Sequence, residues 1–259
     1  MNLPSTGVFQ VPVKSGDGQF IYCTNGTDSF NLTCRMQFAD YEPVTRDLFR
    51  KVAAHSLVTV DIGAYSGLYS LEATLANPRA QVWAFEPMSA PRALLQRNVD
   101  ANGLGSRVRV RDLALSDHEG AVTFFLNAKE ASSTRASILH WVEDQEGYTI
   151  EVQTMTMDSA LGEVGLPIDL VKMDVEGVED RVLAGGSRTL AIHKPVLFTE
   201  ALSDAALAEQ RAVVTPYGYG PPFAVVSAVE SDARNYIWVH PLREQQILPV
   251  LGSLVTRVP

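Results

Sequence analysis

The stretch that decides the fold is LVTVDIGAYSGLYSLEA, residues 57–73. Its apolar start predicts a strand buried on both faces, and this strand ends in the carboxylate of Asp61. The next turn holds Gly63 and Gly67, which let the main chain bend sharply and approach a ligand without a Cβ in the way. A helix is predicted from Leu68, and its first N–H groups have no partner within the helix. The stretch therefore predicts a ligand cradle, with an ordinary turn and a chance acid as the alternative.

Apolar runs and helical patterns alternate along the rest of the chain. The runs are QVWAFE, RVRVRD, IDLVKMD and PVLFTE, and the helical patterns cover 68–75, 91–101, 179–183, 187–192 and 204–214. Strands that are apolar on both faces and alternate with helices indicate a parallel sheet covered on both sides. The final runs, FAVVSAV and NYIWVHP, predict a hairpin. The predicted fold class is therefore α/β, with a mostly parallel sheet and an antiparallel last strand.

Two segments do not follow this alternation. Residues 1–55 are predicted to form a small N-terminal cap. In it, a β-hairpin turns at Asn25-Gly26 between strands at 18–24 and 29–35, and Tyr41-Glu42-Pro43 opens a helix that runs to about Ala54. Residues 56–259 are predicted to form the sheet domain. Within it, AVTFFL and YTIEVQT predict an inserted pair of strands at about 121–154.

Composition excludes several classes of partner. The chain has 259 residues, of which 46% are hydrophobic, and a formal net charge of −9 without any Lys/Arg-rich run. An acidic surface repels phosphate backbones, so no nucleic-acid partner is expected. Cys23 and Cys34 lack CxxC spacing and are interpreted as thiols. With neither a signal-peptide pattern nor an apolar run near the roughly 20 residues that span a bilayer, the protein is expected to be cytoplasmic and not membrane-bound. The sequence leaves homodimerisation open.

A second acid points to the kind of ligand. Glu86, in the sequence Phe85-Glu86-Pro87, ends the second predicted strand 25 residues after Asp61. An acid at that distance is placed to accept both hydroxyls of a ribose. The turn has the form D-x-G-x-x-x-G, and Tyr65 stands where a dinucleotide fingerprint would have glycine beside a pyrophosphate. The pattern resembles the first motif of class I S-adenosylmethionine (SAM) methyltransferases, and SAM is the predicted cofactor.

The other distinctive run is IDLVKMDVEGVEDRVLAGG, residues 168–186. It places Lys172 and Asp174 at the end of a buried strand and Glu176 and Glu179 just after it. Burying a lone lysine charge is costly, so Lys172 needs a partner. Asp174 is expected at the same sheet edge as Asp61 and Glu86. The alternative is that Lys172 forms a structural ion pair and that the two glutamates cap the next helix.

With these motifs in place, the chain resembles the FkbM-type methyltransferases. The residues that carry the resemblance are VDIGAYSGLYS, AFEPMSAPRALLQRNVDANGL, ALSDHEGAVTF, TMTMDSAL, IDLVKMDVEGVEDRVLAGG and PVLFTEA. Tyr65 departs from the asparagine that the family more often has. The resemblance implies a class I methyltransferase, Rossmann-like sandwich. It also implies methyl transfer from SAM to a hydroxyl oxygen, less often an amide nitrogen, of a sugar, polyketide or other secondary metabolite.

The resemblance also extends the set of candidate site residues. After the third strand, Asp112 or Asp117 is expected to meet the adenine amine, with Ala114 or Leu115 over the ring. The cofactor-binding candidates are Asp61, Gly63, Tyr65, Gly67, Glu86, Pro87, Asp112, Ala114 and Leu115. The candidate bases are Asp174, Glu176, Glu200 and His140, with Lys172 orienting Asp174 or the acceptor. Asp174 and Glu200 could alternatively hold a divalent cation.

Two other functions fit parts of the pattern. A nucleotide-dependent oxidoreductase also has a Rossmann-type cradle, and a SAM-binding module without catalysis has the same cofactor motif. Binding of SAM in competition with NAD(P) separates the first from a methyltransferase. Release of S-adenosylhomocysteine (SAH) in the presence of an acceptor separates the second.

Overall fold

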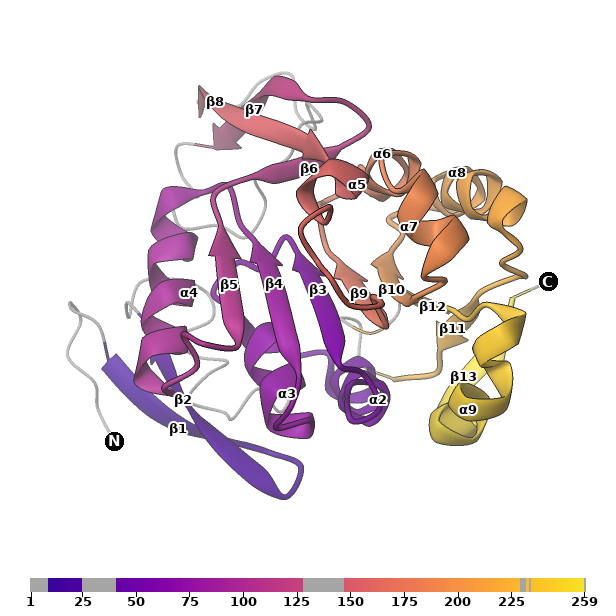
Figure 1. Ribbon diagram of the computed structural model, residues 1–259, viewed down its shortest axis with the longest axis horizontal. Helices are drawn as coiled ribbons and strands as arrows, with labels where there is room; N and C mark the ends of the chain where they lie inside the picture. The colour runs from indigo at the N-terminus through magenta and orange to yellow at the C-terminus, as the bar shows by residue number, and fades with distance from the viewer. Residues whose placement is uncertain (1–8, 25–40, 128–146, 229–231, 233, 259) are drawn as a thin grey trace.

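A single eight-stranded sheet forms the centre of the molecule (Figure 1). The computed structural model describes residues 9–24, 41–127, 147–228, 232 and 234–258. The sheet order is β13-β11-β12-β10-β9-β3-β4-β5. The strands are β3 (Val58–Ile62), β4 (Gln81–Phe85), β5 (Val108–Arg111), β9 (Leu170–Met173), β10 (Val196–Glu200), β11 (Phe223–Val225), β12 (Asn235–Trp238) and β13 (Val255–Arg257).

Strand direction places the functional edge of this sheet. Strands β5, β4, β3, β9 and β10 are parallel, whereas β12 runs antiparallel to β10. β11 and β13 follow as antiparallel neighbours. The strand order reverses between β3 and β9, and in open α/β sheets ligands bind beyond the carboxyl ends of the strands at such a reversal. The fold class is α/β, with a mostly parallel sheet that ends in antiparallel strands, as predicted.

Both faces of the sheet are covered by helices (Figure 1). On one face lie α2 (Pro43–Ala53), α3 (Leu68–Ala76), α4 (Ser89–Ala101) and α9 (Pro241–Leu251). On the other lie α5 (Met157–Ala160), α6 (Glu179–Ala184), α7 (Ser187–Ile192) and α8 (Asp204–Val214). Neighbouring strand residues alternate between the two cores: Val82 and Ala84 belong to the first, Trp83 and Phe85 to the second. This alternation explains why the strands are apolar throughout.

The N-terminal hairpin differs from the predicted one. β1 (Phe9–Ser15) pairs antiparallel with β2 (Gly18–Thr24), and the turn between them is Gly16-Asp17, with Gly16 at φ 54°. β2 has the predicted bounds, but its partner precedes it in the chain. The predicted turn at Asn25-Gly26 and the strand at 29–35 lie outside the described residues. A two-residue Gly-Asp loop is itself a hairpin signal, which the stronger Asn-Gly pair obscured.

A smaller three-stranded sheet lies beside the carboxyl edge (Figure 1). β7 (Gly120–Asn127) pairs antiparallel with β8 (Gly147–Thr156), which pairs parallel with β6 (Ala114–Ser116). The connection at 128–146, which contains His140, lies outside the described residues. The division at residue 55 stays a prediction. In the described part of the chain, every helix is too short or too polar to cross a membrane.

Candidate cofactor and acceptor site

The turn after β3 is held mainly by main-chain bonds. The N–H groups of Gly63 and Ala64 both donate to the Phe85 carbonyl at 3.0 Å, and that of Tyr65 donates to Glu86 Oε2 at 2.9 Å. Gly67, at φ 85°, precedes the first residue of α3. A Cβ on Gly67 would lie 2.3 Å from Leu95 Cδ1. The turn is thus fitted against α4 and the end of β4.

The structure shows a constraint on Gly63 that the sequence did not predict. A Cβ on Gly63 would lie 1.9 Å from the main-chain oxygen of Asp174, and the residue has φ 73°. The glycine therefore allows the β3 turn to pass directly beside the end of β9. It also lines the pocket described below. The predicted role of Gly63 in the approach to the cofactor stays a prediction.

Glu86 lies at the end of β4 with only 5% of its surface exposed. Its two oxygens accept the N–H groups of Tyr65, at 2.9 Å, and Met88, at 2.8 Å. Burial raises the pKa of Glu86 to about 7. A carboxylate oxygen has a second lone pair, so each oxygen retains capacity for one ribose hydroxyl. Pro87, the next residue, accepts a bond from Arg92 at 2.6 Å through its carbonyl oxygen.

Lys172 is the centre of a buried charge cluster. It is 1% exposed and stands opposite Asp61 in the parallel register of β3 and β9. Its Nζ lies 3.5 Å from Asp174 Oδ2 and 5.0 Å from the centre of the Tyr69 ring. Burial alone would lower the pKa of Lys172, but the carboxylates of Asp174, Glu42, Glu200 and Asp61 raise it above its ordinary value. The surrounding carboxylates therefore favour the charged form of the lysine.

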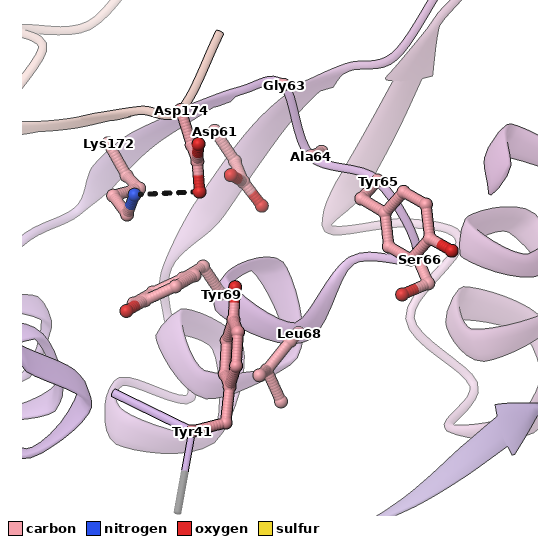
Figure 2. Close-up of a pocket in the computed structure, with 10 residues that line it drawn as sticks. All are labelled: Tyr41, Asp61, Gly63, Ala64, Tyr65, Ser66, Leu68, Tyr69, Lys172 and Asp174. Carbon is pink, nitrogen blue, oxygen red and sulfur yellow. Dashed lines mark ion pairs between the residues drawn. The ribbon is translucent and has the colours of Figure 1, made fainter. Parts of the chain in front are cut away.

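A pocket opens between this cluster and the glycine turn (Figure 2). Lys172, Asp61 and Asp174 line one side, and the side chains of Tyr41 and Tyr69 lie across from them. The remaining lining residues are Gly63, Ala64, Tyr65, Ser66 and Leu68. The structure thus brings together predicted residues from both motifs at the carboxyl ends of β3 and β9.

Asp61 is held differently from Asp174. The Ser70 hydroxyl donates to Asp61 Oδ2 at 2.6 Å, and burial raises the pKa of Asp61 to about 6. Asp174 has 30% of its side chain exposed and faces the pocket. Of the two acids, Asp174 is thus the one that a bound molecule can reach.

The other predicted acids lie around this pocket and are absent from its described lining. Burial, followed by the charge of Asp174, raises the pKa of Glu200 to about 7. Glu176 is half-buried at φ 56°. Glu179 accepts the N–H groups of Val175 at 3.1 Å and Gly177 at 3.5 Å, so it holds its own loop. Both donors precede α6, so Glu179 does not cap that helix as the alternative predicted.

Glu42 was not predicted as a site residue. It precedes α2 at φ 44° and its side chain does not cap that helix. Asp232 does so instead, accepting the Thr45 N–H at 2.8 Å. The Glu42 carboxylate, 6% exposed, accepts the Tyr69 hydroxyl at 2.5 Å and the Asn235 amide at 2.7 Å. An acid just before a helix-starting proline was the available signal, but it predicts only a helix start.

The adenine candidates already have protein partners. Asp112 pairs with Arg92 at 2.5 Å, and Asp117 binds the His118 ring at 2.6 Å. The bond from His118 lowers the pKa of Asp117. Ala114 is buried beside β7 and β8. Leu115 is buried in the core between the central sheet and helices α5 to α8. A role for any of the four in adenine binding stays a prediction.

Comparison with known proteins places the chain in a family. A family model described as the methyltransferase FkbM domain matches residues 61–219. The 31-O-demethyl-FK506 methyltransferase FkbM of Streptomyces tacrolimicus is 30% identical over 213 residues, 71% of this chain and 74% of that protein. The 2-O-methyltransferase NoeI of Sinorhizobium fredii is 35% identical over 146 residues, 51% of this chain and 58% of that protein.

A solved structure agrees with this assignment at the level of the fold. The crystal structure of methyltransferase FkbM from Methylobacillus flagellatus KT superposes with a TM-score of 0.54 at 18% identity, and the match covers 81% of this chain and 51% of that one. The chain thus spans little more than half the length of NoeI and about half of the crystallised protein. The family match begins within β3, at Asp61, and includes the glycine turn, β4, β9 and β10. The chain belongs to the FkbM methyltransferase family.

Proposed function

We propose that the protein is a SAM-dependent O-methyltransferase that modifies a hydroxyl of a small molecule, such as a sugar or another secondary metabolite. The observation that carries this proposal is the pocket itself. It is lined on one side by Lys172 and Asp174, whose Nζ and Oδ2 atoms are 3.5 Å apart, and on another by the glycine turn. The names of NoeI and of the Streptomyces enzyme, both O-methyltransferases, support oxygen as the acceptor atom. The net charge of −9 supports a small molecule over nucleic acid.

The residues present fit SAM. The free lone pairs of Glu86 suit the two ribose hydroxyls, and the turn from Gly63 to Gly67 borders the pocket with little side-chain bulk. SAM supplies a methyl group on a positively charged sulfur. The pocket presents the aromatic faces of Tyr41 and Tyr69 and the carboxylates of Asp61 and Asp174. Aromatic faces and carboxylates both attract a cation such as this sulfur. The chain's task is then to orient an acceptor hydroxyl and to receive its proton.

We assign proton removal to Asp174. It lines the pocket, whereas the described lining does not include Glu200 or Glu176. Lys172, whose Nζ lies 3.5 Å from Asp174 Oδ2, holds this carboxylate in place. Glu200, with its pKa of about 7, is the second candidate, since it can accept a proton near neutral pH.

We propose that Asp174 works as a base, not as a metal ligand. Among the described residues, no three or more His, Cys, Asp or Glu side chains are placed to hold a metal ion. The test is direct: EDTA should leave the rate unchanged. Loss of activity in EDTA that Mg²⁺ or Mn²⁺ restores would favour the alternative in which Asp174 and Glu200 hold a divalent cation.

The function itself is tested by binding and product release. Calorimetry should show that SAM and SAH bind at micromolar concentrations and that NAD(P) does not compete. Incubation with SAM and a panel of sugars and other hydroxyl compounds should release SAH in step with a methyl ether. Competition by NAD(P) would favour an oxidoreductase, and binding without SAH release from any acceptor would favour a non-catalytic module. A methylated amide would move the acceptor atom from oxygen to nitrogen.

A further inference from the structure

The N-terminal hairpin reaches the glycine turn from outside the sheet. Tyr22 of β2 is 1% exposed, and its hydroxyl is hydrogen-bonded to the hydroxyl of Ser66, the turn residue that follows Tyr65. Ser66 is itself buried. Tyr22 lies outside the part of the chain that matches the family model, residues 61–219. A segment outside the family match therefore contacts the loop that borders the pocket.

A buried amide joins the same two segments through their main chains. Asn98 of α4 is 0% exposed. Its Oδ1 accepts the N–H of Cys23 at 2.5 Å, and its Nδ2 donates to the carbonyl oxygen of Ser66 at 2.7 Å. The Asn98 side chain thus binds the hairpin through its amide oxygen and the turn through its amide nitrogen. A buried carbonyl left without a donor is costly, so this bond constrains the position of the turn.

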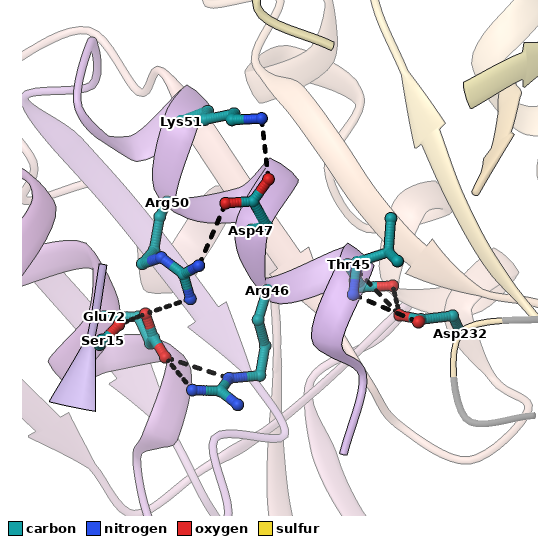
Figure 3. A network of polar contacts seen from close by, with 9 residues as sticks. Ser15, Thr45, Arg46, Asp47, Arg50, Lys51, Glu72 and Asp232 are labelled. Carbon is teal, nitrogen blue, oxygen red and sulfur yellow. Dashed lines mark hydrogen bonds and ion pairs between the residues drawn. The ribbon is translucent and has the colours of Figure 1, made fainter. Parts of the chain in front are cut away.

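The loop end of the hairpin is bound to α3, the helix that follows the glycine turn. The hydroxyl of Ser15, the last residue of β1, donates to the carboxylate of Glu72 in α3 (Figure 3). Glu72 is 0% exposed and pairs with Arg46 of α2 at 2.6 Å and with Arg50 at 3.2 Å. The hairpin is thus tied to α3 at its loop end and to the start of α3 through Ser66.

The turn needs such support because of its backbone. Tyr65 has φ 49°, in the left-handed region that residues with a Cβ rarely adopt. Residues in that region persist only where the surrounding structure over-determines them. On one side of Tyr65, its N–H donates to Glu86. On the other, Ser66 is held through its carbonyl by Asn98 and through its hydroxyl by Tyr22.

We propose that Asn98 and Tyr22 are positioning residues for the cofactor: they hold the turn in its binding geometry before SAM arrives, and the N-terminal hairpin is thereby part of the cofactor site. This inference rests on the proposed function, because it assumes that the turn binds SAM. A loop that is already ordered loses less conformational entropy on binding. Removing either contact should therefore weaken binding, although neither residue touches the cofactor in this account.

Asn102 provides a matched control one helical turn further along. Its Oδ1 accepts the N–H of Ile21 at 2.8 Å, and its Nδ2 donates to the Ile21 carbonyl at 2.7 Å. It therefore binds the same hairpin from the same helical region, and its third bond goes to the Asn98 carbonyl oxygen, at 2.8 Å, rather than to the turn. Asn98→Ala and Asn102→Ala both weaken hairpin docking, but only the first removes a bond to Ser66.

The experiment is calorimetric titration of SAH into the full chain, with thermal unfolding of each variant measured alongside. The Kd should rise about tenfold in Asn98→Ala and about threefold in Tyr22→Phe, against less than about twofold in Asn102→Ala. Thermal unfolding should show similar losses for the two asparagine variants, so that a general loss of stability cannot account for the difference. Tyr22→Phe removes a single hydroxyl and serves if Asn98→Ala does not fold.

Three outcomes are distinguishable. The predicted order of Kd values supports the inference. Wild-type affinity in Tyr22→Phe together with equal affinities in the two asparagine variants overturns it, while wild-type binding of SAH leaves the proposed function intact. A wild-type chain that does not bind SAH contradicts the proposed function and removes this inference with it.

Discussion

The two sides of the pocket are built in different ways. On the β4 side, the pocket is lined by the turn, whose main-chain N–H groups bind the Phe85 carbonyl and the Glu86 carboxylate; these two acceptors are not among the described lining residues. On the β9 side, side chains meet: one buried lysine is surrounded by Asp174, Glu42, Glu200 and Asp61. The first side fixes a shape, and the second sets charge and proton affinity. We therefore expect changes on the β4 side to alter cofactor binding and changes on the β9 side to alter turnover.

Gly63→Val should disturb both sides of the pocket at once, because Gly63 lies where the two sides meet. Its Cβ would lie 1.9 Å from the Asp174 oxygen, at φ 73°. Backbone strain and overpacking each cost about 1–3 kcal/mol, so we expect a loss of unfolding free energy of about 3 kcal/mol or more, together with loss of SAH binding. Urea unfolding measures the first and calorimetry the second.

Gly103→Val is the control for that variant. Gly103 also has positive φ, at 64°, but nothing lies within 4 Å of a Cβ built there. It therefore carries the strain without the collision. Equal unfolding free energies for the two variants would mean that the contact with Asp174 imposes no constraint on the turn.

Asp174→Asn tests the β9 side alone. Asparagine keeps the shape of the side chain but does not take a proton, and a general base contributes typically about 10²–10⁴-fold to a rate. Single-turnover methyl transfer should fall by at least about 100-fold, whereas the Kd for SAH should stay within about twofold of wild type. Asp100→Asn, on the exposed side of α4, should behave as wild type. A rate within about threefold of wild type would move the base to Glu200 or His140.

Glu86→Gln tests the β4 side alone. Hydrogen bonds to a charged group are worth about 1.5–3 kcal/mol, so the Kd for SAH should rise by about 10- to 100-fold. The rate at saturating SAM should stay close to that of wild type. Calorimetry and steady-state kinetics together measure this split. A lower rate at saturating SAM with unchanged affinity for SAH would mean that Glu86 acts in turnover and not in cofactor binding.

The pH dependence of SAH binding sharpens the same point. The pKa of Glu86 without cofactor is about 7, raised by burial, and a carboxylate accepts from ribose hydroxyls better than a carboxylic acid does. Protonation competes with binding, so wild-type affinity should fall as the pH is lowered through 7. Calorimetry of Glu86→Gln over the same range should show a smaller change. An equal pH dependence in both proteins would assign the titrating group elsewhere.

Glu42→Gln should have a moderate effect on the β9 side. Both partners of the carboxylate, Tyr69 and Asn235, donate to it, and glutamine accepts at only one of its two terminal atoms. We expect turnover to fall by about tenfold, as for one lost bond to a charged group, with SAH affinity nearly unchanged. Steady-state kinetics beside the exposed control Glu163→Gln measures this. Wild-type turnover would make Glu42 a purely structural link between α2 and β12.

Glu179→Gln should have the smallest effect, and only on stability. Burial raises the pKa of Glu179 to about 7, so the folded chain binds this proton more tightly than the unfolded chain does. Its contribution to stability is fully present below the unfolded pKa and is lost as the pH rises through 7. The stability of wild type relative to Glu179→Gln, from urea unfolding at pH 5 and pH 8, should therefore decrease with rising pH. An increase in this relative stability from pH 5 to pH 8 would contradict the raised pKa of Glu179.

The same contrast explains what the sequence could predict. Asp61, Glu86, Lys172 and Asp174 were found because each ends a strand, and the ends of parallel strands share one edge. The strands and helices around them followed from the alternation of apolar runs with helical patterns, and α8 has the predicted bounds, Asp204–Val214. These features depend on local sequence.

The residues that were missed depend on distant packing. Glu42 contacts the pocket residue Tyr69, while Asp232, far along the chain, caps α2. The constraint on Gly63 comes from a carbonyl group of β9 that no local pattern reveals. α9 was missed for a local reason: Pro249 lies inside it, and a proline normally ends a predicted helix. β13, three residues long, is recognisable only through its pairing with β11.

The most direct test of the account is single-turnover transfer of a labelled methyl group from SAM to a hydroxyl acceptor, measured for Glu86→Gln and Asp174→Asn over a range of SAM concentrations. The account predicts that the rate of Glu86→Gln rises to the wild-type value when SAM is saturating, whereas the rate of Asp174→Asn stays at least about 100-fold lower at every concentration. If saturating SAM restores both variants, or neither, the division of the pocket into a binding side and a turnover side is wrong.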